Sequence, residues 1–241
     1  MKLLEALEEK IALNKQISET LETSAQTLFK FSFLDVAETK LPKGWEVRGL
    51  DQIASFLNGL ALQKFPPNGD ASLPVIKIAQ LRSGHTENAD RAGTNLPPQY
   101  IIEDGDVLFS WSGSLEVEIW CGGRGALNQH LFKVTSADFP KWFYYLWTRH
   151  HLTFFQNTAA DKATTMGHIQ RHHLHEAKVF VPPSGLMETM NKKFAPLLDK
   201  LVTSRLESRT LAELRDALLP KLLSGELRVP VAESKEGYVR R

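Results

Sequence analysis

The sequence predicts an α+β protein in which one mixed α/β domain is flanked by two long helices. Both ends of the chain carry apolar residues at helical spacing, whereas the middle alternates short β-branched and aromatic runs with turn residues. The middle also holds all 8 histidines and all 5 tryptophans. We therefore expect a helix in residues 1–39, the mixed domain in 40–182, a second helix in 183–229 and a flexible tail in 230–241.

The composition is that of an ordinary globular protein. The 241 residues are 42% hydrophobic and 24% charged, which is enough for a sizeable core and excludes a largely disordered chain. The single cysteine, Cys121, allows no internal disulfide and favours a reducing compartment, so we expect a cytoplasmic protein. No stretch approaches the length of a membrane span, and the net charge of +1 does not by itself indicate a nucleic-acid partner.

The first helix is expected from Leu3 to Phe31, a stretch without glycine or proline. Apolar side chains recur every three or four residues from Leu4 to Leu28, which is typical of a long amphipathic helix with a coiled-coil-like seam. At a rise of 1.5 Å per residue the helix forms a rod of about 45 Å. Its apolar stripe has no partner nearby in the sequence and must pack on a distant segment.

The second helix is expected from about Gly185 to Leu223, a rod of about 60 Å if straight. Pro196 lies inside the pattern, and we expect it to end or kink the helix. Gly225 suits a C-terminal cap.

The two helices are expected to pair as an antiparallel coiled-coil-like rod. They could pair with each other, or equally with the same helices of a second copy. The alternative, an ordinary pair of core helices in one globule, fits their length less well. The residues expected at the dimer or partner surface are Leu4, Leu7, Ile11, Leu21, Leu201, Leu211, Leu214 and Leu218.

The middle block reads as strands separated by polar turns, with one aromatic helix from Pro140 to about Phe155. The expected strands are Trp45–Leu50, Pro74–Ile78, Asp106–Trp111, Leu115–Trp120, His130–Val134 and Ala177–Val181.

The sequence contains no recognisable set of catalytic residues. There is no phosphate-binding GxxxxGK[ST] loop, and no methyltransferase motif. Glu103, Asp104 and Asp106 lie in a turn context and read as loop residues rather than as a nuclease site. His168 and His172 have the spacing of a zinc pair, but no general-base glutamate lies between them. We therefore expect no catalytic residue, no metal and no cofactor.

Several blocks resemble one family in the family's own order. They are Leu41-Pro42-Lys43-Gly44-Trp45-Glu46-Val47, Tyr100-Ile101-Ile102-Glu103-Asp104-Gly105-Asp106-Val107-Leu108 with Ser110-Trp111-Ser112-Gly113, Gly125-Ala126-Leu127-Asn128-Gln129-His130 and Thr164-Thr165-Met166-Gly167-His168-Ile169. The helices from Leu7 to Phe29 and from Leu214 to Glu226 resemble that family's central and distal helices. The family is that of specificity subunits of type I restriction–modification systems.

The resemblance implies a half-length form with one target-recognition domain, whether natural, a remnant or a truncation. Such a subunit is non-catalytic. It would recognise a half-site of a bipartite target in double-stranded DNA and dock methyltransferase subunits, with a restriction subunit as a further partner. The helices would set the half-site spacing, and a two-fold homodimer would read a palindromic pair of half-sites.

We expect the DNA-facing loops at Asn58–Lys64, Gln80–Thr86, Ser110–Ser114 and Thr164–His173, which are polar and rich in turn residues. The candidates for reading bases are Gln80, Arg82, His85, His168, Gln170, Arg171 and His172. Lys64 and Lys77 are candidates for phosphate contacts. The alternatives are a free-standing metal-dependent nuclease and a scaffold module without DNA binding.

Overall fold

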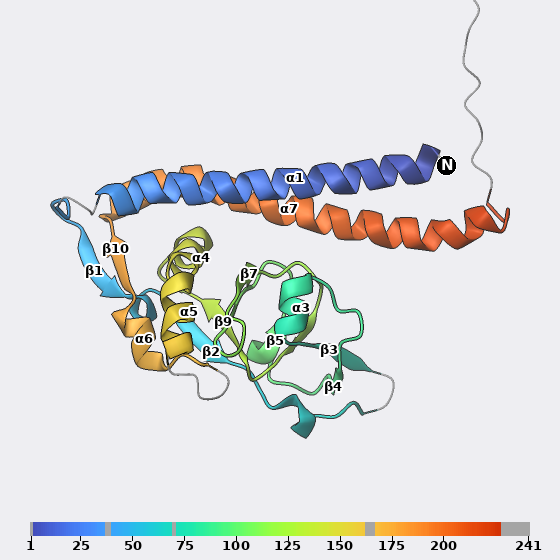
Figure 1. The fold of residues 1–241 in the computed structure, drawn as a ribbon, viewed down its shortest axis with the longest axis horizontal. Helices are drawn as coiled ribbons and strands as arrows, with labels where there is room; N and C mark the ends of the chain where they lie inside the picture. Colours follow the sequence, from blue (N-terminus) through green and yellow to red (C-terminus); the bar gives the residue numbers. More distant parts are fainter. Residues whose placement is uncertain (1, 37–39, 69–70, 162–166, 228–241) are drawn as a thin grey trace, which may run out of the picture.

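The computed structural model describes residues 2–36, 40–68, 71–161 and 167–227. It confirms the α+β architecture, in which a rod of two long helices lies along one side of a mixed domain (Figure 1). The expected tail at 230–241 lies outside the described residues.

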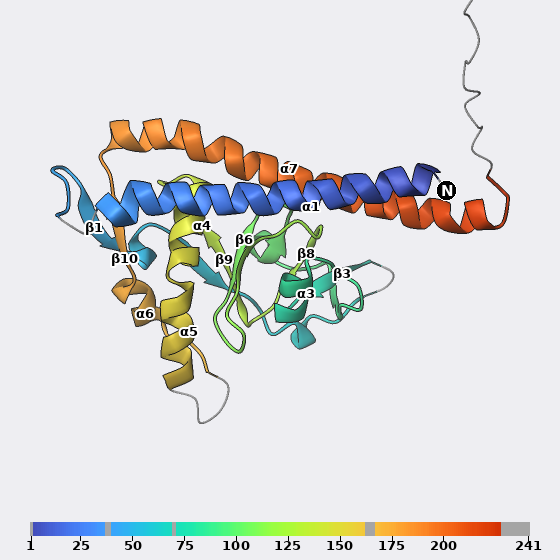
Figure 2. The same ribbon diagram turned by 45° about the horizontal axis from the view of Figure 1, so that its top comes forward.

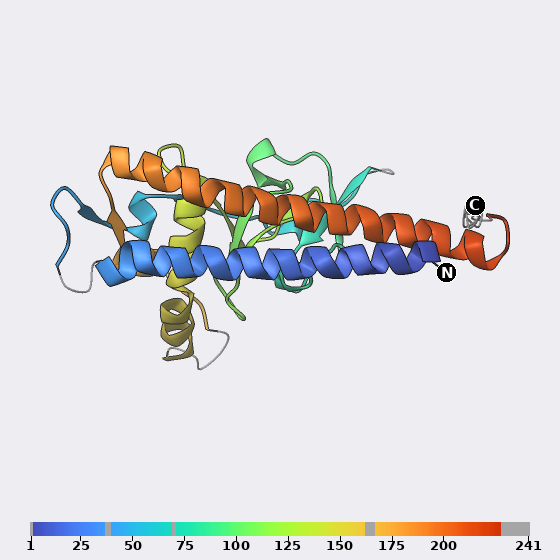
Figure 3. The same cartoon turned by 90° about the horizontal axis from the view of Figure 1, so that it is seen from above.

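The rod consists of α1 (Lys2–Phe29), which continues as a π-helical stretch to Leu34, and α7 (Ser184–Leu223). The two helices run antiparallel along their length (Figures 1 and 3). Phe33 contacts Phe194 with 6.4 Å between ring centroids, and Asn14 Nδ2 donates to Glu207 Oε2 at 2.8 Å farther along. Of the two pairings that the sequence left open, the one within the chain is therefore present.

Pro196 was expected to end or kink the second helix. It does not end it, because α7 runs through both Pro196 and Pro220. Pro196 and Lys192 are both exposed. The carbonyl that loses its helical hydrogen bond to the proline therefore lies on the solvent side, where water can satisfy it.

Three sheets are formed by the strands of the described residues, and only part of them was expected from the sequence. A two-stranded antiparallel sheet pairs β1 (Glu46–Gly49) with β10 (Lys178–Val181). The central antiparallel sheet has the order β2 (Ser55–Asn58), β9 (Leu131–Thr135), β6 (Val107–Ser110), β7 (Val117–Ile119). The third sheet has the order β4 (Arg91–Gly93), β3 (Ser72–Ile76), β8 (Gly125–Leu127), β5 (Ile101–Ile102), with β3 and β8 parallel.

The expected single helix at Pro140–Phe155 is two helices, α4 (Lys141–His150) and α5 (Leu152–Asp161), separated at His151. Figure 2 shows α5 pointing away from the rod. A further helix, α6 (Arg171–Glu176), precedes β10. The segment expected as a loop at Gln80–Thr86 begins inside helix α3 (Ile78–Ser83), which ends at Gly84 with a left-handed φ of 76°.

The main core lies where α4 packs between the central sheet and the rod. Every residue from Trp142 to Thr148 is buried. Trp142 stacks on Phe194 of α7 with 4.3 Å between ring centroids, and Trp147 meets Phe29 of α1 edge-on at 4.9 Å. Aromatic rings thus join the mixed domain to one end of the rod. No helix among the described residues is long and apolar enough to cross a membrane.

Candidate nucleic-acid interface

Three of the expected loops meet at one place, next to the end of β6. Trp111 follows β6, and its N–H donates to the His130 carbonyl at 3.3 Å. Its own carbonyl accepts from the Ile169 N–H at 3.0 Å, and Ser112 forms an isolated bridge with His168. These backbone bonds bring together parts of the chain that are distant in sequence. Residues 162–166, and with them the start of the expected Thr164–His173 loop, lie outside the described residues.

The Trp111 side chain orients its neighbours. The indole Nε1–H donates to Asn58 Oδ1 at 2.8 Å. Because an indole nitrogen can only donate, this bond fixes which way the Asn58 amide points and leaves its NH₂ group free to face solvent. The Trp111 ring lies 6.0 Å from the His130 ring and 6.4 Å, edge-on, from the His168 ring.

Further hydrogen bonds hold His130. Ser112 Oγ lies 2.9 Å from His130 Nδ1, and Gln129 Nε2 lies 3.3 Å from His130 Nε2. The side chains of Asn58, His130 and His168 are exposed. We refer to the whole group as the Trp111 cluster, which consists of Asn58, Trp111, Ser112, Gln129, His130 and His168. It presents donors and acceptors in fixed positions around an aromatic ring, as base recognition requires.

The α3 candidates are largely engaged within the protein. Gln80 Oε1 accepts from the Lys77 backbone N–H at 3.3 Å, so this side chain caps the start of the helix. Arg82 pairs with Glu116 at 3.2 Å. His85 lines a cleft of about 720 Å³ that lies between α3 and the rod, rather than joining the Trp111 cluster.

The remaining candidates are distributed around the domain. Gln170, Arg171 and His172 are exposed at the start of α6. Arg171 lines a cavity of about 550 Å³ beside the beginning of β2, whereas Asn58 lies at the other end of that strand. Lys64 is exposed, and Lys77 forms an ion pair with Asp90, which neutralises part of its charge.

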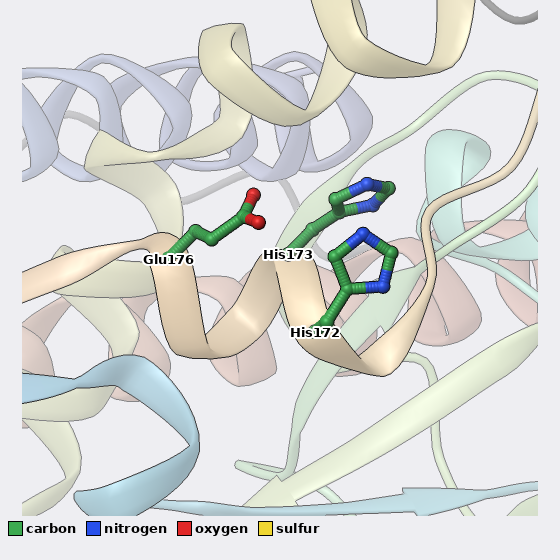
Figure 4. A group of neighbouring side chains, drawn as sticks. All are labelled: His172, His173 and Glu176. Carbon is green, nitrogen blue, oxygen red and sulfur yellow. The ribbon is translucent and has the colours of Figure 1, made fainter.

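Two histidines of α6 form a candidate metal-binding group with Glu176. His172, His173 and Glu176 have candidate ligand atoms within 4.8 Å of one another. Figure 4 shows the two imidazole rings side by side and the Glu176 carboxylate standing apart from them. The buried His173 accepts the Gln170 N–H at Nδ1, at 3.0 Å. Zinc ligands lie about 2.0–2.2 Å from the ion, so a group this open would have to close before it could bind one. His168, the other half of the zinc pair considered from the sequence, lies outside α6.

Cys121 is poorly suited to be a nucleophile. Burial raises the pKa of its thiol to about 11. The thiol is therefore protonated at neutral pH, and a protonated thiol reacts slowly.

Sequence reasoning missed five members of the cluster as contact candidates, namely Asn58, Trp111, Ser112, Gln129 and His130. Asn58, Trp111 and Ser112 lay within expected DNA-facing loops but were not singled out. The signal for Gln129 and His130 was the polar Asn128-Gln129-His130 run directly before an expected strand. Their meeting with Trp111 depends on the β6–β9 pairing, which local sequence does not specify.

Comparisons with known proteins identify the family. The family model described as "Type I restriction modification DNA specificity domain" matches residues 42–216. The chain belongs to this family. It is 26% identical over 237 residues to the MjaIX type I restriction enzyme specificity subunit of Methanocaldococcus jannaschii, a match that spans 89% of this chain and 55% of that protein.

One further curated relative and one solved structure are also type I restriction–modification specificity subunits. The HindI specificity subunit of Haemophilus influenzae is 21% identical over 196 residues, which span 78% of this chain and 42% of that protein. A crystal structure of the type I restriction–modification S subunit from M. genitalium matches with a TM-score of 0.52 and 17% identity, over 91% of this chain and 56% of that one, and shows the same fold. The chain thus spans about half the length of the curated relatives it matches. The family is one of specificity subunits, which are non-catalytic.

Proposed function

We propose that this chain is the DNA-specificity subunit of a type I restriction–modification complex and reads one half-site of a bipartite target. The supporting observation is the Trp111 cluster, in which four polar segments of the chain supply preoriented side chains on one surface. In the same proposal the rod docks the methyltransferase subunits, with a restriction subunit as a further partner. Because the target is cellular DNA and the chain has a single cysteine, we place the protein in the cytoplasm.

The reading chemistry follows from the side chains present. An Asn or Gln amide can bridge adenine, and an Arg can bridge guanine, in the major groove. We propose that Asn58, Gln129 and His168 of the Trp111 cluster read bases, together with Gln170 and Arg171 at the start of α6. Reading by Gln80 or Arg82 would require each to leave the partner it has within the protein. Lys64 is proposed to contact phosphate and to contribute salt-dependent affinity.

A homodimer would supply the second reading domain. Leu214, Leu219 and Leu223 of α7 and Leu13 of α1 are exposed although they are apolar. Such side chains gathered on one rod are suited to an interface with a second copy. Two copies related by a two-fold axis would read two inverted half-sites.

The alternative of a free-standing nuclease has no support in the acidic turn. Asp104 binds Arg209 in a bidentate pair, with both distances 2.8 Å, and Asp106 pairs with Lys133 at 2.7 Å. Glu103 pairs with Arg124 at 3.3 Å. These carboxylates are engaged with cations of the protein itself rather than gathered around a shared ion. We predict that the purified chain neither cleaves DNA with Mg²⁺ nor methylates it with S-adenosylmethionine.

The test of base reading compares substitutions at proposed contacts with a control. Asn58→Ala, Gln170→Ala and Arg171→Ala are measured against the cognate duplex and against its single-base variants, and Gln26→Ala, at an exposed position on α1, is the control. A base reader should lose about 1–3 kcal/mol for the cognate duplex and relax specificity at one position. Equal weakening of all duplexes, or no change, would show that the residue does not read a base.

A further inference from the structure

Three arginines, one from α4 and two from α7 of the rod, bind the β7 edge of the central sheet. β7 is the edge strand of that sheet, so alternate backbone carbonyls along it have no partner strand. Arg149 of α4 donates to the Val117 carbonyl at 3.0 Å. Arg205 of α7 donates to the Ile119 carbonyl at 3.3 Å, and Arg209 of α7 donates to the Cys121 carbonyl at 2.6 Å. The three guanidinium groups thus occupy every second carbonyl, and we call them the arginine ladder.

Each arginine of the ladder is also held by carboxylates. Glu22 of α1 contacts Arg149 at 2.9 Å and Arg205 at 3.2 Å, and Glu118 of β7 contacts the same two arginines at 3.3 and 3.2 Å. Tyr145 donates its hydroxyl to Glu22 at 2.9 Å. The network therefore connects α1, α4, β7 and α7 through charge-assisted bonds between side chains that are at most 27% exposed.

The second attachment on α7 is more exposed but bidentate. Arg209 donates two hydrogen bonds to the Asp104 carboxylate, whose Oδ1 also accepts the Gly123 N–H at 2.8 Å. Arg205 and Arg209 are four residues apart and therefore lie on the same face of α7. That face meets the sheet edge over two successive turns of the helix.

The ladder acts at a distance from the aromatic contacts. Those contacts, at Phe33, Trp142 and Phe194, join the domain to one end of the rod. Arg209 lies 15 residues beyond Phe194, or about 20 Å along the helix. A single attachment would allow the rod to tilt about the aromatic contacts, whereas a second attachment at this distance prevents it. Figure 1 shows the rod extending beyond the mixed domain on the side where α1 begins and α7 ends.

We propose that the arginine ladder fixes the angle between the rod and the reading domain and thereby determines the half-site spacing that a dimer accepts. This inference rests on the proposed function. The connection from the arginine ladder to the Trp111 cluster is short, because β7 pairs with β6 and β6 leads directly into Trp111. A tilt of about 5° displaces a point about 40 Å away by about 3.5 Å, which is about one base-pair step of DNA. The spacing is therefore sensitive to small changes of angle.

The first experiment measures the angle without DNA. Spin labels are placed at Glu9→Cys on the rod and Asn95→Cys in the domain, with Cys121→Ser removing the native thiol, and labelled protein is diluted with unlabelled protein. The ladder variant is Arg205→Ala with Arg209→Ala, and the control is Arg215→Ala, which removes a charge from α7 that is paired with Asp216. We expect a narrow distance distribution for the wild type and the control, and a broad one for the ladder variant. An equally narrow distribution in a folded ladder variant would overturn the proposal.

The second experiment measures spacing. The half-site selected from random duplexes is placed as an inverted pair, with spacers that differ by one base pair. The wild type and Arg215→Ala should prefer one spacer by about tenfold, whereas the ladder variant should bind the neighbouring spacers within about threefold and a single half-site with unchanged affinity. Arg205→Lys with Arg209→Lys keeps the charge but loses the bidentate geometry, and should broaden the preference to an intermediate degree.

The outcomes separate the two proposals. An unchanged spacer preference in a variant whose distances have broadened would overturn the role in spacing. Absence of any duplex binding by the wild type would overturn the proposed function, while the distances would still decide whether the ladder holds the rod in place.

Discussion

The two ends of the rod differ in what covers their apolar side chains. At the domain end, the buried side chains are Ala25 and Phe29 of α1, Phe33 of the π-helical stretch that follows it, and Phe194, Leu198 and Leu201 of α7. Helix α4 supplies most of the rings against them. Farther along the rod, the seam contains buried Asn14, Ser18 and Ser204. Within the described residues, Asn14 Oδ1 and Ser204 Oγ have no hydrogen-bond partner.

This difference assigns separate roles to the ends. The domain end is part of the folding core, because its burial is complete within one chain. The outer end pairs through polar groups such as Asn14 and Glu207 and leaves leucines such as Leu214 and Leu223 exposed. An incompletely covered helix pair is suited to assembly with other subunits. The long helices therefore belong to the core at one end and carry exposed apolar side chains at the other.

The largest expected effect comes from breaking the domain end. Phe33 is fully buried and contacts Trp45, Trp142, Phe143 and Trp147, so Phe33→Ala should lower the free energy of unfolding by about 3–5 kcal/mol. The matched control is Phe31→Ala, two residues away at a position that is 63% exposed. It should change the free energy of unfolding by less than about 0.5 kcal/mol. Urea denaturation measures both, and similar losses for the two variants would contradict the assignment of Phe33 to the core.

A smaller effect is expected from acid. Burial lowers the pKa of His151, which stacks on Trp147, to about 4 from 6.5. Between these values the unfolded chain binds more protons than the folded one, so the contribution of neutral His151 is complete above pH 6.5 and is lost as the pH falls toward 4. The loss is at most about 3–4 kcal/mol.

Urea midpoints measured from pH 7 to pH 5 test this dependence. His151→Gln does not titrate in this range and keeps an amide that can donate to the Lys178 carbonyl, the present partner of His151. The variant should show a shallower pH dependence than the wild type. Identical slopes would show that His151 is not responsible.

The smallest effect on stability is expected at the outer end. Leu214 is 46% exposed, so Leu214→Asp should change the free energy of unfolding by less than about 0.5 kcal/mol. If a second copy covers this surface, the same substitution should weaken self-association in sedimentation experiments. Thr210→Asp, which adds a charge to the same helix without removing an apolar group, is the control. A wild type that remains monomeric at high micromolar concentration would contradict the homodimer proposal.

Local sequence was sufficient for features that depend on periodicity. The spacing from Leu4 to Leu28 predicted α1, and the spacing after Met187 predicted α7, although Pro196 was expected to interrupt it. The break at His151 was missed because aromatic residues continue on both sides of it. Periodicity identifies a helical segment, but solvent exposure decides whether a proline is tolerated.

The candidate site was only partly predictable for a different reason. Polar, turn-rich composition identified the loops that meet at Trp111, but the partner of each side chain depends on tertiary pairing. Trp111 and Asn58 are 53 residues apart, and Arg82 and Glu116 are 34 apart. From the sequence, Arg82 and Gln80 were therefore candidates for contacting bases. In the fold, Arg82 forms an ion pair with Glu116 and Gln80 caps the start of α3.

The central claim is that this chain reads DNA sequence, and selection of bound duplexes from a random pool tests it most directly. The protein is used with its methyltransferase partner, and bound DNA is sequenced after rounds of washing at increasing salt concentration. We expect enrichment of one short motif that occurs twice, in inverted orientation, at a fixed spacing. Recovery of a pool with the same sequence composition as the input would contradict it.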